Sequence, residues 1–426
     1  MIKFLIKGIL RDKSRSLFPI IIVTLTVAMI VFFKGFMMGI LNGIIKDTAT
    51  ISTGHLRVMT KAYEQEQQLF PSDLALLETE KLMVDLHKEY PEYFWTPRII
   101  FAGLLDVPNK DGETIEQGPT VAFGIDLLSA ESREIEMWKL EKKMIDGRLP
   151  DLPNEVILST KLAGRLNIDP GMIITFIGST MHGAFTTFNF KVVGTFSLNM
   201  GPVDKEMMLL DISGARLALD MEGATSEVLG FTHSLYYEDA NAITISEKYN
   251  INNKSDDIFN PVMLALRDSH QMGTIVDVQT AAMKIILGIF LVIVMIVLWN
   301  MGLMSGLRRY GEIGMRLAIG ESKGQVYRSM VMESFLIGLI STIFGTILGL
   351  SITYYMQEVG IDYSKGLENL ARTSVIMSNV FYAKVTSDLY YIGFMPGVLA
   401  TVLGTMLAGR AIYKREMAQL FKELET

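Results

Sequence analysis

The sequence predicts a membrane α-helical protein with four transmembrane helices and a large α+β domain inserted between helices 1 and 2. Two observations of composition support this fold class. Apolar residues make up 50% of the 426 residues and charged residues only 20%, below the roughly 25% of an ordinary soluble chain. The apolar excess is concentrated in four nearly uncharged windows. The stretch between the first two windows is mixed and polar, and it is long enough to bury a core of its own.

The four windows predict the transmembrane helices. They are Leu17 to Phe33 with a helical continuation, Ile285 to Leu307, Ser334 to Gln357, and Leu389 to Gly409. Each is close to the roughly 20 residues that a helix needs to cross about 30 Å of hydrocarbon. The first window exceeds the roughly 7–15 apolar residues of a signal peptide, and no A-x-A site follows it. We therefore interpret it as an uncleaved anchor.

The orientation follows from lysine and arginine residues near the window ends. Five precede the first window, five lie in residues 308–328 and four follow the fourth window, whereas the three in residues 358–388 are balanced by four acidic residues. Every basic cluster therefore falls on one side of the membrane. We expect both termini and residues 308–328 in the cytoplasm.

These boundaries divide the chain into nine segments. The expected order is a cytoplasmic segment (1–16), helix 1 with an outer extension (17–45), the outward-facing α+β domain (46–280), helix 2 (281–307), a cytoplasmic loop (308–328), helix 3 (329–357), an outer loop (358–388), helix 4 (389–409) and a cytoplasmic tail (410–426). No Gly/Pro-rich linker separates residues 261–280 from helix 2, so we expect stiff coupling there.

Local patterns predict the elements of the domain and the packing of the helices. A helical period predicts a helix over 71–90, and residues 179–184 read as a hairpin turn. Five strand-like runs are found at 98–107, 120–125, 172–178, 188–196 and 207–210. In helix 4, Pro396 and Gly397 predict a kink. In helix 3, small residues recur near every fourth position and predict close packing; they are Gly338, Ser341, Gly345 and Gly349.

The charge and the residue counts narrow the function classes. The net charge of −7 provides no basic field for nucleic acid. The absence of cysteine rules out disulfides, thiol chemistry and cysteine-based zinc sites. The five histidines are scattered without metal-ligand spacing, so no metal is expected. No G-x-S-x-G motif supports a nucleophile, so no catalytic residue is expected.

The loop between helices 2 and 3 carries a family resemblance. RRYGEIGMRLAIGESKGQVYRSMVMESFLIGL (308–339) has a basic start, E-I-G, an R-L-A-I-G core and a glutamate that opens the next helix. It resembles the signature of FtsX/MacB-type ABC permeases. Residues 53–63, 158–176 and 190–219 resemble segments of the lipoprotein-releasing LolC/LolE group. The resemblance covers nearly the whole chain, and it implies four helices with a periplasmic domain between the first two, in the bacterial inner membrane.

The resemblance also implies a short coupling helix, seated on an ATPase subunit. The residues implied are Glu312, Ile313, Gly314, Arg316, Leu317 and Gly320. Their spacing is physically reasonable, because Ile313 and Leu317 are i,i+4 on one face and Gly320 is a natural helix stop. A solvated basic loop that serves only topology is the alternative from the residues alone.

The chain contains no G-x-x-x-x-G-K-[ST] loop to cradle phosphates and no L-S-G-G-Q. We therefore expect a permease subunit and not an enzyme, with no cofactor of its own. ATP and Mg²⁺ are expected on a separate LolD- or MacB-like ATPase, present in two copies. Four helices are few for a pathway, so a second permease is expected, as an identical copy or a paralogue.

Candidate cargo contacts lie on the first helix. Met29, Met37 and Met38, with Phe33 among them, could adapt to irregular apolar cargo, although packing is the alternative. Lys34 interrupts the apolar run, and a lysine at mid-bilayer costs about 2.5–3.5 kcal/mol. We expect it to snorkel to the outer interface. The functional alternative places it in a cleft between two permeases, near an anionic headgroup.

The resemblance implies extraction of a lipoprotein or another amphiphilic cargo from the outer leaflet, driven by ATP through mechanotransmission. MacB-type efflux with a periplasmic adaptor is the runner-up, although MacB proteins usually carry a fused N-terminal ATPase domain. Control of a cell-wall hydrolase, as by FtsX, is the third hypothesis, although its outer domain is normally much smaller. The LolC/LolE group hooks a periplasmic chaperone with an extended hairpin. The corresponding turn, Gly178 to Thr187, is shorter, which leaves chaperone binding, cargo and direction open.

Overall fold

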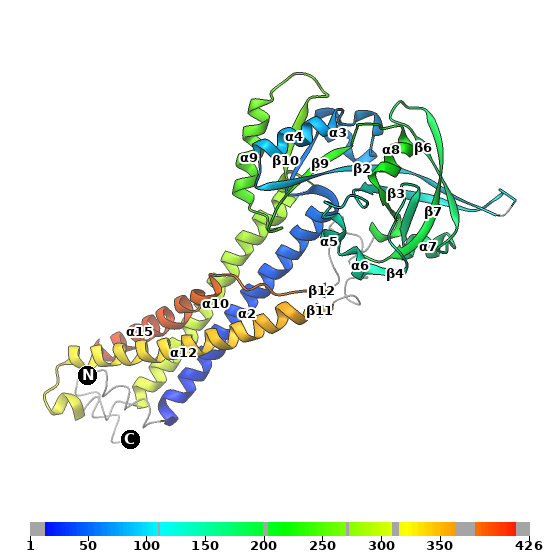
Figure 1. Ribbon diagram of the computed structural model, residues 1–426. Helices are drawn as coiled ribbons and strands as arrows, with labels where there is room; N and C mark the ends of the chain where they lie inside the picture. The colour runs from blue at the N-terminus through cyan, green and yellow to red at the C-terminus, as the bar shows by residue number, and fades with distance from the viewer. Residues whose placement is uncertain are drawn as a thin grey trace. The chain divides into compact units, whose positions relative to one another are not determined.

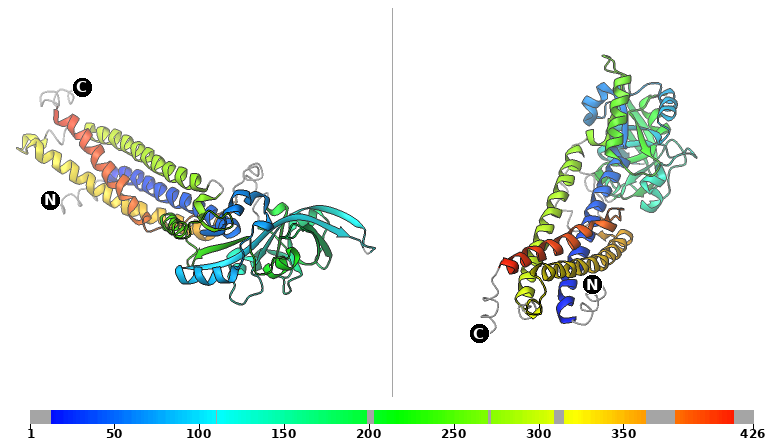
Figure 2. Two further views of the ribbon diagram at one scale, coloured as in Figure 1. Left: turned by 90° about the horizontal axis from the view of Figure 1, so that it is seen from above. Right: turned by 90° about the vertical axis from the view of Figure 1, so that its left-hand side faces the viewer.

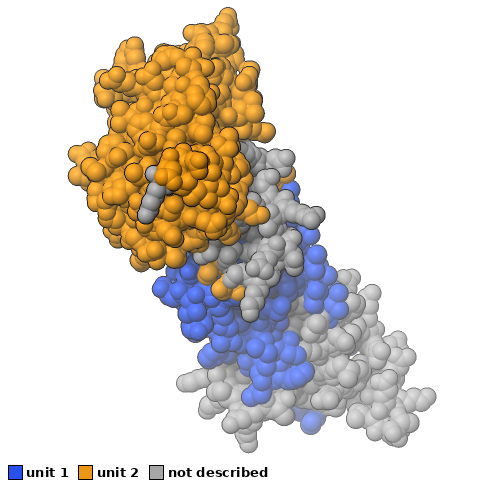
Figure 3. Space-filling view, turned by 90° about the vertical axis from the view of Figure 1, so that its right-hand side faces the viewer, with its two compact units in different colours: residues 1–42, 277–361, 381–426 blue, residues 43–276, 362–380 orange. Residues whose placement is uncertain are grey.

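The structure is a computed structural model, and it describes residues 13–109, 111–198, 203–269, 272–308, 315–362 and 380–414. Its contacts divide the chain into two compact units (Figure 3). The helical unit comprises residues 1–42, 277–361 and 381–426. The α/β unit comprises residues 43–276 and 362–380.

Long apolar helices build the helical unit (Figures 1 and 2). They are α2 (Lys13–Thr48), α10 (Met272–Arg308), α12 (Lys323–Val359), α14 (Leu389–Ile392) and α15 (Ala400–Lys414), with the short strands β11 (Ile361–Asp362) and β12 (Val380–Phe381) paired after α12. Within the described residues, four helices are long and apolar enough to cross a membrane: Leu17–Thr53, Met272–Phe290, Lys323–Val359 and Leu389–Leu407. Each overlaps one of the predicted windows.

The start of α12 is set by a capping box. Ser322 lies in an extended conformation and its hydroxyl accepts a hydrogen bond from the Gln325 N–H, while the Ser322 N–H donates to Gln325 Oε1 at 2.9 Å. This exchange satisfies backbone groups that a helix start leaves unpaired. The helix therefore begins at Lys323, ahead of the predicted start of helix 3 at residue 329.

Small residues let α12 approach its neighbours closely. A Cβ added at Gly345 would lie 2.7 Å from the Thr24 carbonyl oxygen of α2, and one at Gly349 would lie 2.8 Å from that of Ala28. A Cβ added at Gly338 would lie 2.8 Å from the Gly397 carbonyl oxygen of η6. The close packing predicted for this stripe is present, and van der Waals contact between backbones is what such stripes provide in membranes.

The fourth apolar segment is broken where Pro396 and Gly397 predicted a kink. A π-helical turn, η6 (Met395–Leu399), separates α14 from α15. Pro396 has no N–H for a helical hydrogen bond, so the regular ladder is interrupted there. Gly397 continues the chain with a bond from its N–H to the Gly393 carbonyl at 2.9 Å.

One mixed sheet forms the frame of the α/β unit. Among the described residues it has ten strands, in the order β10-β1-β9-β2-β3-β8-β5-β7-β4, with β6 pairing β2 and β7. The strands are β1 (Leu56–Thr60), β2 (Tyr93–Pro108), β3 (Thr114–Ile125), β4 (Met144–Gly147), β5 (Glu155–Ser159), β6 (Ile173–Ser179), β7 (Phe185–Phe196), β8 (Met207–Asp211), β9 (Glu227–Thr232) and β10 (Pro261–Ala265). All five predicted strand runs lie in this sheet.

The long strand β2 joins two halves of the sheet, as Figure 1 shows. Residues 93–98 pair antiparallel with β9, and residues 99–108 pair antiparallel with β3. Two buried cores pack against the sheet on opposite faces, because successive residues of β8 alternate between them. Trp95 and Trp138 belong to the first, and Phe101 and Phe176 to the second. Ile51, which follows α2, and Met272, the first residue of α10, also belong to the first core.

Short helices cover the sheet. They are α3 (Lys61–Glu66), α4 (Thr79–Glu89), α5 (Glu134–Trp138), α6 (Leu140–Lys143), α7 (Thr160–Arg165), α8 (Ile212–Leu219) and α9 (Asp239–Asn252). Single turns complete them: the π-helical η1 (Ala49–Thr53) and the 3₁₀ turns η2 (Gln67–Leu69), η3 (Ser72–Leu74), η4 (Val203–Lys205) and η5 (Leu266–Asp268).

The helix predicted over 71–90 is wrong in its first half. α4 begins only at Thr79, because Leu76 exchanges two backbone hydrogen bonds with Thr225, at 2.8 and 3.0 Å. Glu78 then takes a left-handed conformation with φ of 50°, which ends any helix before it. An isolated β-bridge to a residue distant in the sequence thus overrides the helical period. By contrast, the predicted turn at 179–184 does join β6 to β7 as an antiparallel hairpin.

Candidate functional site

The predicted coupling helix is described from Met315 onward, and Glu312, Ile313 and Gly314 lie outside the described residues. Residues 315–318 are helical. Gly320 has a φ of 102°, and the Glu321 N–H donates to the Arg316 carbonyl at 3.0 Å. A glycine in this conformation ends a helix without the strain that a side chain would add. Gly320 therefore acts as the predicted stop.

The exposed apolar residues of this segment are not among the predicted coupling residues. Leu317 is half-buried, and Arg316 donates to Ser329 Oγ of α12 at 3.5 Å. Met315 and Ile319, four residues apart, are 61% and 81% exposed. Sequence reasoning missed this pair, although two apolar residues at i,i+4 within a polar loop were the available signal. An exposed apolar pair beside charged residues is suited to contact another protein.

Lys34, a predicted cleft residue, has a partner within the helical unit. Its ammonium pairs with Asp388 Oδ2, and the Thr386 hydroxyl donates to the other carboxylate oxygen. The side chain of Lys34 is only 15% exposed. Sequence reasoning missed Asp388, because it lies 354 positions away and directly before α14. The cost of a lysine beside apolar helices is offset here by a protein carboxylate.

The segment that contains Asp388 connects α2 with α12. The Lys384 N–H donates to the Gly35 carbonyl at 2.9 Å, and Lys384 Nζ donates to Asn42 Oδ1 at 3.2 Å, both on α2. The Val385 N–H donates to Gln357 Oε1 near the end of α12 at 2.8 Å. These bonds hold residues 384–388 across the same end of both helices. The polar groups thereby satisfy one another beside apolar surface, as buried polar groups must.

The other predicted cleft residues separate from Lys34. Met29 is 55% exposed, and the Phe33 ring lies 5.9 Å from that of Phe290 on α10. Met37 and Met38 are half-buried. Met29, Phe33 and Met37 follow at i,i+4 along one stripe of α2, whereas Lys34 points to α14. The structure thus does not bring all five residues to one surface.

Comparison with known proteins assigns a family to most of the helical unit. Residues 284–417 match the family model described as FtsX-like permease C-terminal. Residues 284–417 form an FtsX-like permease C-terminal domain. The matched range contains the whole coupling segment, α12, α14 and α15, and it confirms the family predicted from residues 308–339. No curated protein matches the chain significantly.

One solved structure similar to this permease is described as the crystal structure of the periplasmic region of MacB from Actinobacillus actinomycetemcomitans. The similarity covers 54% of the permease and 96% of that chain, at 14% sequence identity and a TM-score of 0.35. Nothing about function follows from a similarity of this size.

In the α/β unit of the permease, a buried ion pair lies at the end of α2. Arg98 of β2 binds Glu134 of α5 through two bonds, Nε to Oε1 at 3.1 Å and Nη2 to Oε2 at 2.8 Å. Their side chains are 0% and 1% exposed. Glu134 also accepts bonds from Thr96 Oγ1 and from the Trp138 ring N–H, at 3.0 and 2.8 Å. Both carboxylate oxygens thereby accept two hydrogen bonds each, which fixes the orientation of the carboxylate.

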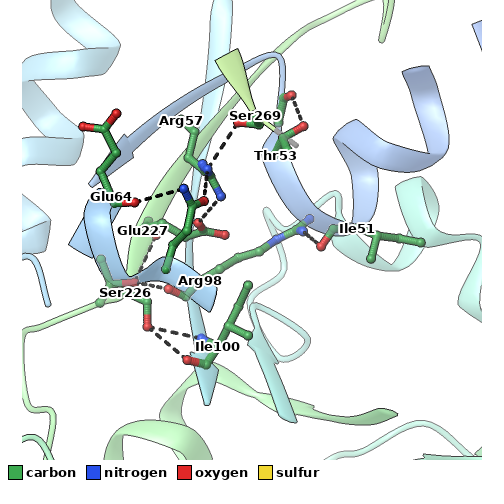
Figure 4. Close-up of polar contacts among 12 residues, drawn as sticks. Ile51, Thr53, Arg57, Glu64, Arg98, Ile100, Ser226, Glu227 and Ser269 are labelled. Carbon is green, nitrogen blue, oxygen red and sulfur yellow. Dashed lines mark hydrogen bonds and ion pairs between the residues drawn. The ribbon is translucent and has the colours of Figure 1, made fainter. Parts of the chain in front are cut away.

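Arg98 uses its remaining donors on η1. Its Nη1 donates to the carbonyl oxygens of Thr50 at 2.6 Å and of Ile51 at 3.1 Å (Figure 4). The last carbonyls of a helix have no intrahelical partner and carry partial negative charge. A buried guanidinium therefore satisfies the end of the apolar helix. No sequence signal pointed to this contact.

A second buried pair lies beside it (Figure 4). Arg57 of β1 pairs with Glu227 of β9 at 3.3 Å, and its Nη2 donates to Gln67 Oε1 at 2.6 Å and to Ser269 Oγ at 3.2 Å. Burial raises the pKa of Glu227, against the opposing charges of Arg57 and Arg98. Ser269 follows η5 and precedes α10. The second arginine thus contacts the chain shortly before the second apolar helix.

Proposed function

We propose that this permease is the membrane subunit of an ATP-driven ABC transporter. The observation that carries the proposal is the exposed pair Met315 and Ile319, beside the helix stop Gly320 and inside the matched range 284–417. Permeases of this type work with ABC ATPase partners. A short helix with an exposed apolar pair gives the ATPase a contact surface through which its movement can be transmitted to the permease.

The proposed cargo is a lipoprotein or another amphiphilic molecule, extracted from the outer leaflet of the bacterial inner membrane. The resemblance of residues 53–63, 158–176 and 190–219 to lipoprotein-releasing permeases supports this choice. The proposed topology places both termini in the cytoplasm and the α/β unit in the periplasm, between helices 1 and 2. The basic residues that flank the apolar windows support it.

The continuity of the chain supports a mechanical mode of action. α2 runs as one helix from Lys13 to Thr48, and η1 follows it directly, with Ala49 and Ile51 buried in the core of the α/β unit. α10 begins at Met272, which belongs to the same core. A movement of either helix can therefore reach the α/β unit without passing through a flexible linker.

The working complex would contain two ATPase copies and two permeases. Four apolar helices are few for a pathway, which supports the second permease. The hairpin of β6 and β7 closes early, since Ser179 and Phe185 form its last pair. Such a short hairpin extends only a short way toward a periplasmic chaperone or adaptor. The test below therefore measures cargo release with and without each of them.

The test uses the permease purified with its ATPase subunit in lipid nanodiscs that contain acylated protein. Ile319→Asp puts a charge on the exposed apolar pair and should lower cargo release per ATP by about fivefold or more, the size of a typical coupling energy. Glu312→Lys and Leu317→Asp should act in the same direction. Glu321→Gln, at an exposed neighbouring position, is the matched control and should leave coupling unchanged.

Mass spectrometry of the purified complex, with and without a chaperone or adaptor, identifies the cargo. Recovery of acylated protein that ATP releases supports the proposal. Robust drug-stimulated ATP hydrolysis without acylated cargo would select efflux instead. Coupling that is identical in Ile319→Asp and the unsubstituted protein would show that this segment is not the ATPase contact.

A further inference from the structure

Two of the connections between the α/β core and the apolar helices are the turn η1 after α2 and the segment before α10. A buried arginine contacts each point. Arg98 donates to the carbonyls of Thr50 and Ile51, and Arg57 donates to Ser269 Oγ. Each arginine comes from a strand of the sheet and each is paired with a buried glutamate.

Stability alone does not account for these pairs. The desolvation of two buried charges commonly cancels their attraction, so that apolar residues of similar volume can replace such a pair at little cost. The Arg57 pair is also incompletely bonded, because Arg57 Nε and Glu227 Oε1 have no hydrogen-bond partner among the described residues. Buried groups of this kind are costly. We therefore look for a role of these pairs in holding neighbouring elements in a fixed arrangement.

The shape of the guanidinium suits such a role. It is planar and presents donors in a rigid fork. In Arg98, one edge binds Glu134 through Nε and Nη2, while Nη1 reaches η1. The Arg98 guanidinium also lies 5.3 Å from the Trp138 ring and 5.9 Å from the Phe231 ring. Sheet, α5 and η1 are thereby locked into one arrangement by a single side chain.

We propose that Arg98, held by Glu134, is a positioning residue that joins the end of α2 rigidly to the sheet, so that a displacement of α2 is passed to the α/β unit. Arg57 plays the same part for the segment before α10. The proposal rests on the proposed function, since a transporter driven through its helices needs such a joint. It adds the residues through which the movement passes.

The test replaces the pair by apolar residues, in the double variant R98M/E134L of the full permease with its ATPase. The matched control is R148M/E155L, which also removes one arginine and one glutamate joined at 2.6 Å. This pair lies elsewhere in the sheet, because Arg148 directly follows β4 and Glu155 is the first residue of β5. Hydrogen exchange of the peptide 49–55 reports the joint. We expect exchange to rise about tenfold or more in R98M/E134L, the effect of losing charge-assisted bonds.

Cargo release per ATP reports the function of the joint, and we expect a fall of about fivefold or more with ATP hydrolysis retained. Unchanged hydrogen exchange at residues 49–55 would contradict the proposal that Arg98 fixes η1. Raised exchange with unchanged cargo release per ATP would contradict the proposal that this contact transmits movement. Glu134→Gln keeps the side-chain shape and serves the same comparison should the double variant not assemble. If the unsubstituted complex releases no cargo, the proposed function fails, and the exchange measurement still decides whether Arg98 fixes η1.

Discussion

His55 follows η1 by two residues and shows how burial controls a single side chain. It is 2% exposed, and its ring lies 5.6 Å from the Phe231 ring and 5.7 Å from the Tyr237 ring. The Thr232 N–H donates to Nδ1 at 3.2 Å, so this nitrogen carries no proton. Burial lowers the pKa of His55 from 6.5 to about 4. The ring is therefore neutral at physiological pH.

The lowered pKa predicts acid sensitivity. Between pH 6.5 and pH 4 the unfolded chain binds a proton at His55 that the folded chain does not, so the free energy of unfolding should fall as the pH is lowered through this window. The loss should reach about 3 kcal/mol, at 1.36 kcal/mol per pKa unit. Thermal unfolding followed by tryptophan fluorescence measures it, because Trp95 and Trp138 lie in this core.

A variant and a control make this prediction specific. His55→Asn removes the titrating ring and keeps an acceptor for Thr232, so the dependence on pH in this window should flatten. His182, which is 66% exposed, should be replaceable by asparagine without such a change. An equally steep dependence in His55→Asn would assign the acid sensitivity to other groups.

At the scale of elements, α12 packs against α2, η6 and α15. Its buried face is polar or small, with Ser341, Thr342 and Thr353 fully buried. The Ser341 and Thr353 hydroxyls donate to carbonyls one turn earlier, at 2.7 Å each. The Ser341 and Thr353 hydroxyls therefore need no partner from another helix, and close approach of the backbones determines the packing.

Gly345→Ala tests this packing. The added Cβ would lie 2.7 Å from both the Thr24 carbonyl oxygen and the Val27 Cβ, so α2 must move away. Overpacking of this kind typically costs about 1–3 kcal/mol, and the midpoint of thermal unfolding in detergent should fall. Gly324→Ala is the matched control on the same helix. Nothing lies within 4 Å of its added Cβ, so its effect should be neutral or slightly stabilising.

At the scale of the whole molecule, the proposed function depends on topology. The coupling segment must share a compartment with the ATPase, and the α/β unit must lie on the other side. Since the chain has no cysteine, single cysteines report sidedness without background. His182→Cys in the β6–β7 turn should react with an impermeant maleimide in intact spheroplasts, and Glu321→Cys should react only after permeabilisation. Labelling of Glu321→Cys from outside would remove the basis of the transport proposal.

Several elements could be predicted from the sequence because they depend on neighbouring residues. The apolar windows are long enough to be helices wherever they lie, and Pro396 interrupts its own helix. Gly320 ends the coupling segment for an equally local reason. The helix predicted over 71–90 failed because Leu76 pairs with Thr225, a contact about which the local period carries no information.

The sequence by itself thus determined the apolar helices, the strand runs of the sheet and the helix stop at Gly320. The tertiary structure alone decided which charges meet: Lys34 with Asp388, and Arg98 with Glu134 and the end of α2. The physical reason is that hydrophobicity and helix stops act over a few residues. A buried charge instead takes whichever partner the folded chain brings within hydrogen-bond distance.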